Sequence, residues 1–104
     1  MELMAHFFIK LIGPRPTFPF DMNESERALM TQHAQYFQER FNQRKVLIYG
    51  PVMDPQGPYG MGVLEVADDA EARGIMDADP SVVAGLNRYE MYPMKIGGAQ
   101  ASAV

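Results

Sequence analysis

Two side chains that can transfer protons, His33 and Asp79, stand out because the chain has few groups of this kind. It contains two histidines and no cysteine, and histidine is the side chain whose charge changes closest to neutral pH. His33 falls among Leu29, Met30 and Phe37 on the apolar stripe of an expected helix. An imidazole in that position needs a polar partner. Asp79 is one of a few acids that could supply it, so we expect the pair to form a proton-transfer site.

Each of these two residues also has a purely structural explanation. His33 could be a half-buried histidine that hydrogen-bonds a backbone carbonyl. Asp79 precedes Pro80, and an Asp-Pro pair is typical of a helix start in which Asp caps the first turn. The two roles of Asp79 are compatible, because one carboxylate oxygen can cap the helix while the other orients the imidazole and fixes its tautomer.

Composition excludes several other classes of function. With 104 residues, 47% of them hydrophobic and 21% charged, the chain is expected to form one globular domain. A formal net charge of −4 offers no electrostatic footprint for nucleic acid or an anionic membrane surface. No segment is long and apolar enough to span a membrane, and the first residues do not resemble a signal peptide. We therefore expect a cytoplasmic protein that binds neither nucleic acid nor membrane.

Motifs for metals, nucleotides and nucleophilic catalysis are not found in the sequence. His6 and His33 are far apart and show no metal-ligand spacing, so we expect no bound metal. Ser25 and Ser81 do not lie in a Gly-x-Ser-x-Gly elbow. The glycines form neither a GxGxxG nor a P-loop pattern. A reaction at His33 is thus expected to need no cofactor.

Hydrophobic periodicity and capping signals indicate the elements that position His33. Residues 5–12 alternate as a strand with Phe7, Ile9 and Leu11 on one face. Residues 14–20 follow with three prolines and two phenylalanines, a loop expected either to line a pocket or simply to pack on the core. Asn23 and Glu26 then have the spacing of a capping box, which starts a helix that should run to about Phe41.

The rest of the chain completes an α+β pattern. Residues 45–52 and 60–66 flank a dense turn signal and should form a β-hairpin. Helices are expected from Asp68 to about Met76 and, as a short turn, after Asp79, followed by a last strand over 86–94. The order β-α-β-β-α-β is that of a ferredoxin-like sandwich with both helices on one sheet face. Since no third layer remains to cover the opposite face, we expect a homodimer that buries it.

Eight short segments of the chain also follow one another in the order and spacing of a known family. They are Phe7-Phe8-Ile9-Lys10-Leu11, Pro14-Arg15-Pro16-Thr17-Phe18, Met30-Thr31-Gln32-His33 with Tyr36, Gly50-Pro51-Val52, Asp54-Pro55, Gly57-Pro58-Tyr59-Gly60, Asp79-Pro80 and Arg88-Tyr89-Glu90. By these segments the chain resembles the YciI-like, or YCII-related, domain proteins over about residues 5–94. The expected division is a YCII-related domain over residues 1–95 and a flexible tail over residues 96–104.

The resemblance implies a dimeric α+β barrel made of ferredoxin-like subunits. It also implies a site centred on one histidine and one aspartate, which correspond to His33 and Asp79. No reaction is firmly assigned to most members of the family.

Three further side chains could contact a small-molecule ligand. Arg15 could anchor an acidic group, because guanidinium binds carboxylate or phosphate through two parallel hydrogen bonds. Alternatively, it is a solvated loop charge. Tyr36 lies three residues after His33, and Tyr59 lies at the hairpin. Both tyrosines could donate a hydroxyl, although packing alone would also explain them.

The residues leave two functions open. The first is a cofactor-independent isomerase, lyase or hydrolase acting on a small acidic or carbonyl-bearing molecule in a cleft between the first helix and the sheet. There His33 would transfer a proton and Asp79 would orient it. The second is a non-catalytic module that binds or senses a small ligand through the same pair, since no nucleophile, metal set or cofactor motif is present.

Overall fold

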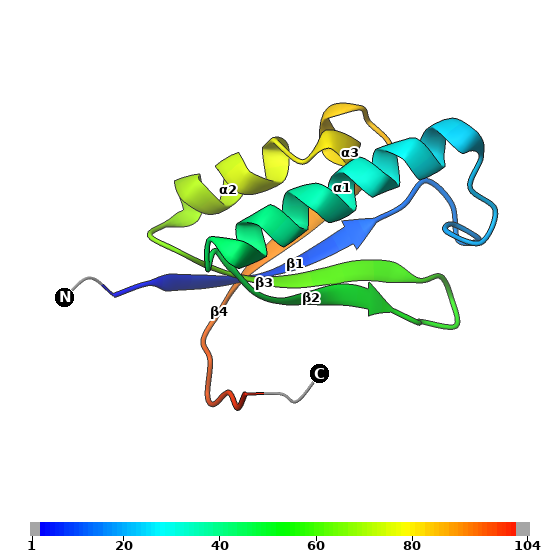
Figure 1. Cartoon of the computed structure of the whole chain (residues 1–104). Helices are drawn as coiled ribbons and strands as arrows, with labels where there is room; N and C mark the ends of the chain where they lie inside the picture. The colour runs from blue at the N-terminus through cyan, green and yellow to red at the C-terminus, as the bar shows by residue number, and fades with distance from the viewer. Residues whose placement is uncertain (1–2, 102–104) are drawn as a thin grey trace.

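The computed structural model describes residues 3–101, which form a four-stranded antiparallel sheet with three helices on one face (Figure 1). The strands are β1 (Ala5–Ile12), β2 (Val46–Val52), β3 (Tyr59–Val66) and β4 (Arg88–Met94). The helices are α1 (Glu24–Asn42), α2 (Asp69–Asp77) and α3 (Pro80–Val83). The strand order β2-β3-β1-β4, with antiparallel neighbours, is compatible with the predicted ferredoxin-like sandwich.

The largest difference from the predicted boundaries is at the start of the last strand. β4 begins at Arg88 instead of Leu86. The amides of Leu86 and Asn87 both donate to the Ser81 carbonyl, each at 3.0 Å. These two residues therefore close the turn after α3 and do not pair in the sheet.

The core lies between the helices and one face of the sheet. The predicted alternation of β1 is confirmed, because Phe7, Ile9 and Leu11 are all buried on the helix side. Gly62 of β3 allows α1 to approach closely, since a Cβ at this position would lie 3.3 Å from the Phe37 ring. The buried cluster consists of Phe7, Ile9, Leu11, Phe37, Val46, Leu64, Val66, Ala72 and Met76.

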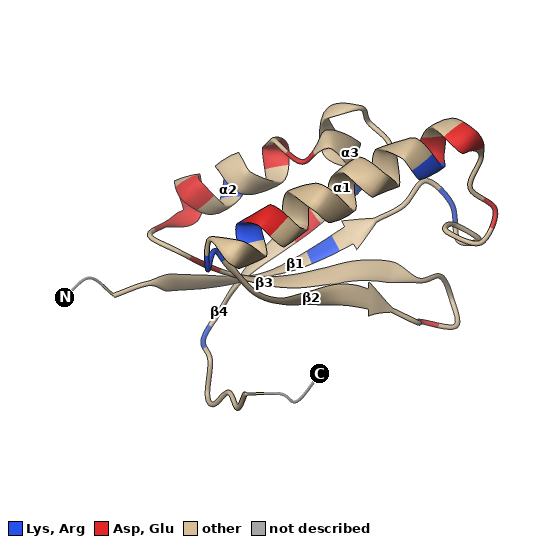
Figure 2. Cartoon of the chain, viewed as in Figure 1, with Lys and Arg blue, Asp and Glu red and all other residues tan. Residues whose placement is uncertain are grey.

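The opposite face of the sheet is not covered by any helix of residues 3–101 (Figure 1). The strand register aligns Ile48, Val63, Phe8 and Tyr92 in one row across all four strands. Ile48 is 57% exposed, and its strand β2 carries no charged residue (Figure 2). This face therefore carries an apolar row with no partner inside the subunit, beside the charged side chains of Lys10, Glu65 and Glu90. None of the helices described in residues 3–101 is long and apolar enough to cross a bilayer.

Candidate functional site

The structure brings His33 of α1 and Asp79 into direct contact. The imidazole Nδ1 lies 2.6 Å from Asp79 Oδ2. The Asp79 side chain has no exposed surface, whereas that of His33 is 17% exposed. The other Asp79 oxygen, Oδ1, accepts 2.8 Å hydrogen bonds from the Ser81 amide and the Ser81 hydroxyl. One carboxylate thus caps α3 and also contacts the imidazole.

The hydrogen bonds to Asp79 determine its charge. Burial raises the pKa of the Asp79 carboxyl, but the hydrogen bond and charge of His33, together with the two Ser81 bonds, outweigh burial. The net result is a pKa below the usual aspartate value. A carboxylate can only accept hydrogen bonds, so His33 Nδ1 must carry the proton that joins the pair. In a neutral imidazole, Nε2 then carries no proton and can accept one. Within residues 3–101, Nε2 has no hydrogen-bond partner.

A cavity of about 310 Å³ lies next to the His33 ring, between α1, the sheet and the loop that follows β1. The ring packs on Phe37, with centroids 4.9 Å apart, and both residues line the cavity. Nearly all of the lining is aliphatic or aromatic. The lining residues are Leu11, Gly13, Phe18, Pro19, Met30, His33, Ala34, Phe37, Tyr49, Gly50, Pro51, Met53, Pro58, Tyr59, Gly60, Met61 and Asn87.

Asn87 is a second polar side chain in the cavity wall. It is buried, and its Nδ2 lies 3.3 Å from the sulfur of Met30, which precedes His33 by one helical turn. The sequence does not predict Asn87 as a site residue. It contains little signal for it, because Asn87 falls inside the segment whose periodicity predicts a strand.

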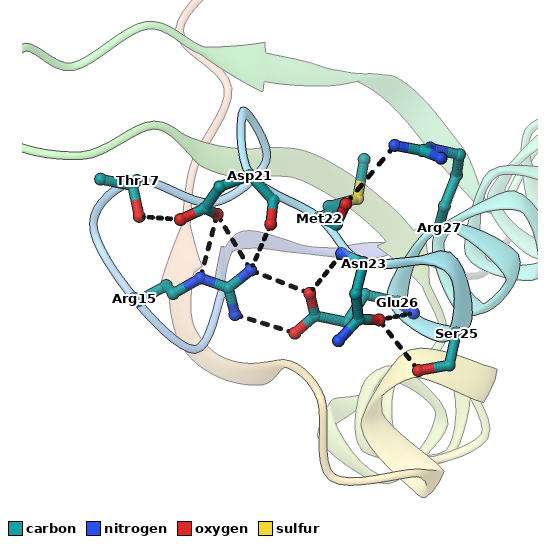
Figure 3. Close-up of polar contacts among 8 residues, drawn as sticks. All are labelled: Arg15, Thr17, Asp21, Met22, Asn23, Ser25, Glu26 and Arg27. Atoms are coloured by element: carbon teal, nitrogen blue, oxygen red, sulfur yellow. Dashed lines mark hydrogen bonds and ion pairs between the residues drawn. The ribbon is translucent and has the colours of Figure 1, made fainter.

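Arg15 belongs to an ion-pair network (Figure 3). It is not among the residues that line the His33 cavity. Its guanidinium donates two 2.8 Å hydrogen bonds to the Glu26 carboxylate and two of 2.9 Å to Asp21, one to the carboxylate and one to the backbone carbonyl. These bonds raise the pKa of Arg15, and they are the main reason that the pKa of Glu26 falls to about 2. The role expected for Arg15, anchoring an acidic substrate, thus has no support from this geometry.

The two predicted tyrosines differ in their relation to the cavity. Tyr36 points elsewhere: its hydroxyl donates to the Ile75 carbonyl at 2.6 Å, and its ring lies under the Arg40 guanidinium. Tyr59 lines the cavity and has Lys10 Nζ 4.6 Å from the centre of its ring. Of these two, only Tyr59 is placed to contact a ligand beside His33.

The described part of the chain lacks the side-chain clusters that bind metals. Within residues 3–101, no group of three or more His, Cys, Asp or Glu side chains could hold a metal ion.

No curated protein matches the chain significantly. A sequence model of the YCII-related domain matches residues 7–95, which is most of the chain and agrees with the predicted resemblance. The chain therefore belongs to the YCII-related domain family.

Proposed function

We propose that this protein is a cofactor-independent enzyme in which His33 transfers a proton within a small organic substrate and Asp79 positions the imidazole. One observation supports this most directly. His33 is bonded through Nδ1 to a buried, ionised carboxylate, while its ring borders an otherwise apolar cavity. A general base needs this combination of a fixed tautomer and access to the substrate.

The reaction would begin at His33 Nε2, which takes a proton from a carbon next to the substrate carbonyl. The imidazolium formed in this step is stabilised by the Asp79 carboxylate, and the electron pair moves toward the carbonyl oxygen. Returning the proton to a different atom of the same molecule gives an isomerisation with no net gain or loss of atoms. The buried Asn87 amide is suited to donate a hydrogen bond to the oxygen that gains charge.

The cavity favours a compact, mostly apolar substrate. A volume of about 310 Å³ lies at the lower end of the range typical for small-molecule sites. Apolar walls would desolvate a charged group at high cost. The polar part of the substrate is therefore expected beside His33 and Asn87, and its apolar body against the aromatic side of the cavity.

Deuterium incorporation tests this proposal whatever the product of the reaction is. Mixtures of small ketones, lactones and enols are incubated with the protein in D2O, and mass spectrometry detects exchange next to each carbonyl. We expect exchange with wild type and at least a roughly hundredfold loss in His33→Gln, the usual contribution of a general base. His6→Gln is the matched control, because His6 bonds Glu65 at 2.9 Å on the opposite sheet face. Equal exchange in folded His33→Gln and wild type would refute the proposal.

A non-catalytic binding module is the second candidate function. It is favoured by the near absence of acid–base groups other than His33 among the cavity residues. Thermal-shift screening with the same compounds distinguishes the two functions. A ligand that stabilises wild type and His33→Gln equally, with no deuterium incorporation in either, would indicate binding without catalysis.

We also propose that two subunits pair through the uncovered sheet face. The row of Ile48, Val63, Phe8 and Tyr92 would otherwise leave an apolar patch in water, and symmetric pairing of identical faces is the commonest way to bury one. Light scattering should give twice the subunit mass of 11.7 kDa. Ile48→Glu should lower this mass, whereas Val83→Glu, at an exposed position on α3, should not. A wild-type monomer at micromolar concentration would refute the pairing.

A further inference from the structure

Residues 13–22, here called the strap, join β1 to α1 (Figure 1) and contribute Gly13, Phe18 and Pro19 to the wall of the His33 cavity. Its two phenylalanines have opposite environments. Phe18 is 5% exposed and lines the cavity, whereas Phe20 is 72% exposed. The strap therefore contributes one aromatic ring to the cavity and leaves the other in solvent.

Polar contacts hold the strap in one conformation relative to α1. The Arg15 guanidinium joins Asp21 of the strap to Glu26 in the first turn of α1 (Figure 3). Glu26 also accepts a 3.0 Å hydrogen bond from the Asn23 amide, so the same carboxylate completes the helix cap. Since α1 carries His33 two turns further on, this network fixes the strap relative to the imidazole.

The position of Phe18 follows from these contacts. Its amide donates to the Arg15 carbonyl at 3.1 Å, and the Arg15 guanidinium lies 5.6 Å from its ring. On the other side, a Cβ added to Gly13 would lie 2.6 Å from Phe18 Cδ1, which is closer than real contacts allow. The ring therefore has no room to move toward Gly13, and it occupies the cavity side of the strap.

We infer that Phe18 limits the size of the molecule that can lie beside His33, and that the Arg15 network is the clamp that keeps Phe18 in place. The preferred ligand is a single flat apolar ring that packs against Phe18, with its polar group toward His33. Arg15 is then a positioning residue that does not contact the ligand. This inference rests on the proposed function only in taking the cavity as the ligand site.

The test measures size selectivity with three neutral aromatic alcohols of increasing size: phenol, 1-naphthol and 1-hydroxypyrene. Dissociation constants are obtained by titration, and the imidazole NMR signals of His33 report whether the probe lies in the cavity. In wild type, phenol should bind in preference to 1-hydroxypyrene. Phe18→Ala should lower the dissociation constant of 1-hydroxypyrene relative to that of phenol by about tenfold or more. A change of this size is usual when an apolar pocket is altered.

Two further variants make the result specific. Phe20→Ala removes the same ring from the exposed position of the strap and should leave the ratio unchanged. Phe18→Leu keeps an apolar side chain in the cavity and should give an intermediate ratio, which preserves the test if Phe18→Ala does not fold.

If the ratio of the dissociation constants of phenol and 1-hydroxypyrene is the same in the Phe18 and Phe20 variants, the inference is overturned. The cavity would then remain a ligand site. Failure of all probes to perturb the His33 signals, in wild type and both Phe18 variants, would overturn it as well. Neither outcome decides the proposed function, because deuterium exchange in His33→Gln tests that separately.

Discussion

Replacing Asp79 should be the most damaging single change at the candidate site. This carboxylate accepts three hydrogen bonds, from His33 Nδ1 at 2.6 Å and from the Ser81 amide and hydroxyl at 2.8 Å. Asp79 and Ser81 are fully buried, so water cannot replace the lost acceptor at Ser81. Asp79→Ala removes all three bonds, whereas Asp79→Asn keeps one oxygen for Ser81 and removes the charge.

The expected loss of stability follows from these contacts. Each buried donor left without an acceptor costs about 1–3 kcal/mol. Asp79→Ala removes the acceptor of the two buried Ser81 donors and of the partly exposed His33 Nδ1. We therefore expect it to lower the free energy of unfolding by about 3–5 kcal/mol. Asp79→Asn should cost about 1–3 kcal/mol, because the cap remains and mainly the His33 contact is lost.

The effect should also depend on pH in a defined direction. The pKa of Asp79 in the folded protein lies below its usual value, so folding favours the ionised form. The resulting stabilisation is fully present above the unfolded pKa of about 3.9 and is lost as the pH falls through the folded pKa. The difference in stability between wild type and Asp79→Asn should therefore shrink on acidification below about pH 4.

Urea denaturation followed by circular dichroism, from pH 7 down to pH 3, measures both quantities. Asp68→Ala is the matched control. Asp68 also caps a helix, accepting a 2.9 Å bond from the Glu71 amide, but it is exposed, so its loss should cost only about 1 kcal/mol. The reasoning fails if Asp79→Ala costs no more than Asp68→Ala, or if the Asp79→Asn difference grows at low pH.

Two further predictions concern the backbone and the strap. Gly85 has φ +75, a conformation that L side chains rarely adopt, whereas Gly74 lies within α2, and neither has an atom within 4 Å of an added Cβ. Gly85→Ala should therefore destabilise the protein by about 1–2 kcal/mol. Gly74→Ala should stabilise it by about 0.5–1 kcal/mol, and urea denaturation measures both changes. Glu26→Gln should accelerate amide hydrogen exchange in the strap, since the Glu26 charge pairs with Arg15, whereas Asp69→Asn, in an exposed pair on α2, should not. Because the pKa of Glu26 is about 2, the acceleration relative to wild type should persist above about pH 4.5 and diminish as the pH falls toward 2.

The elements of the fold can be predicted because their signals are local. The alternation in β1 and the capping box of Asn23 and Glu26 each depend on residues a few positions apart, and both are present in the structure. Asp68 and Glu71 have the same capping-box spacing at the start of α2, but the box is only half formed. Asp68 caps α2, but the Glu71 side chain accepts from the Ala67 amide and pairs with Lys45 at 2.7 Å. Lys45 is far from α2 in the chain, so local sequence contains no sign of this competition.

The candidate site is predictable only in part, for a related reason. His33 and Asp79 can be selected because a histidine on an apolar stripe needs a polar partner. The interpretation of Arg15 as an anion anchor gains no support, because Glu26, which already has a role in the helix cap, also binds the guanidinium. Asn87 cannot be selected, since its burial depends on the turn that closes at Ser81.

Capping alone does not account for the environment of Asp79. Asp68 makes the same kind of cap on the longer helix α2 while remaining exposed, so burial is not needed for this role. Burying an ionised carboxylate is costly, and an apolar replacement of a buried ion pair is often equally or more stable. Two contacts distinguish Asp79 from Asp68: the bond from the Ser81 hydroxyl, and the bond to His33, whose ring borders the cavity. Helix stability does not explain why Asp79 is buried. A requirement to hold the His33 imidazole in one tautomer would explain it, and this favours a functional role for the pair.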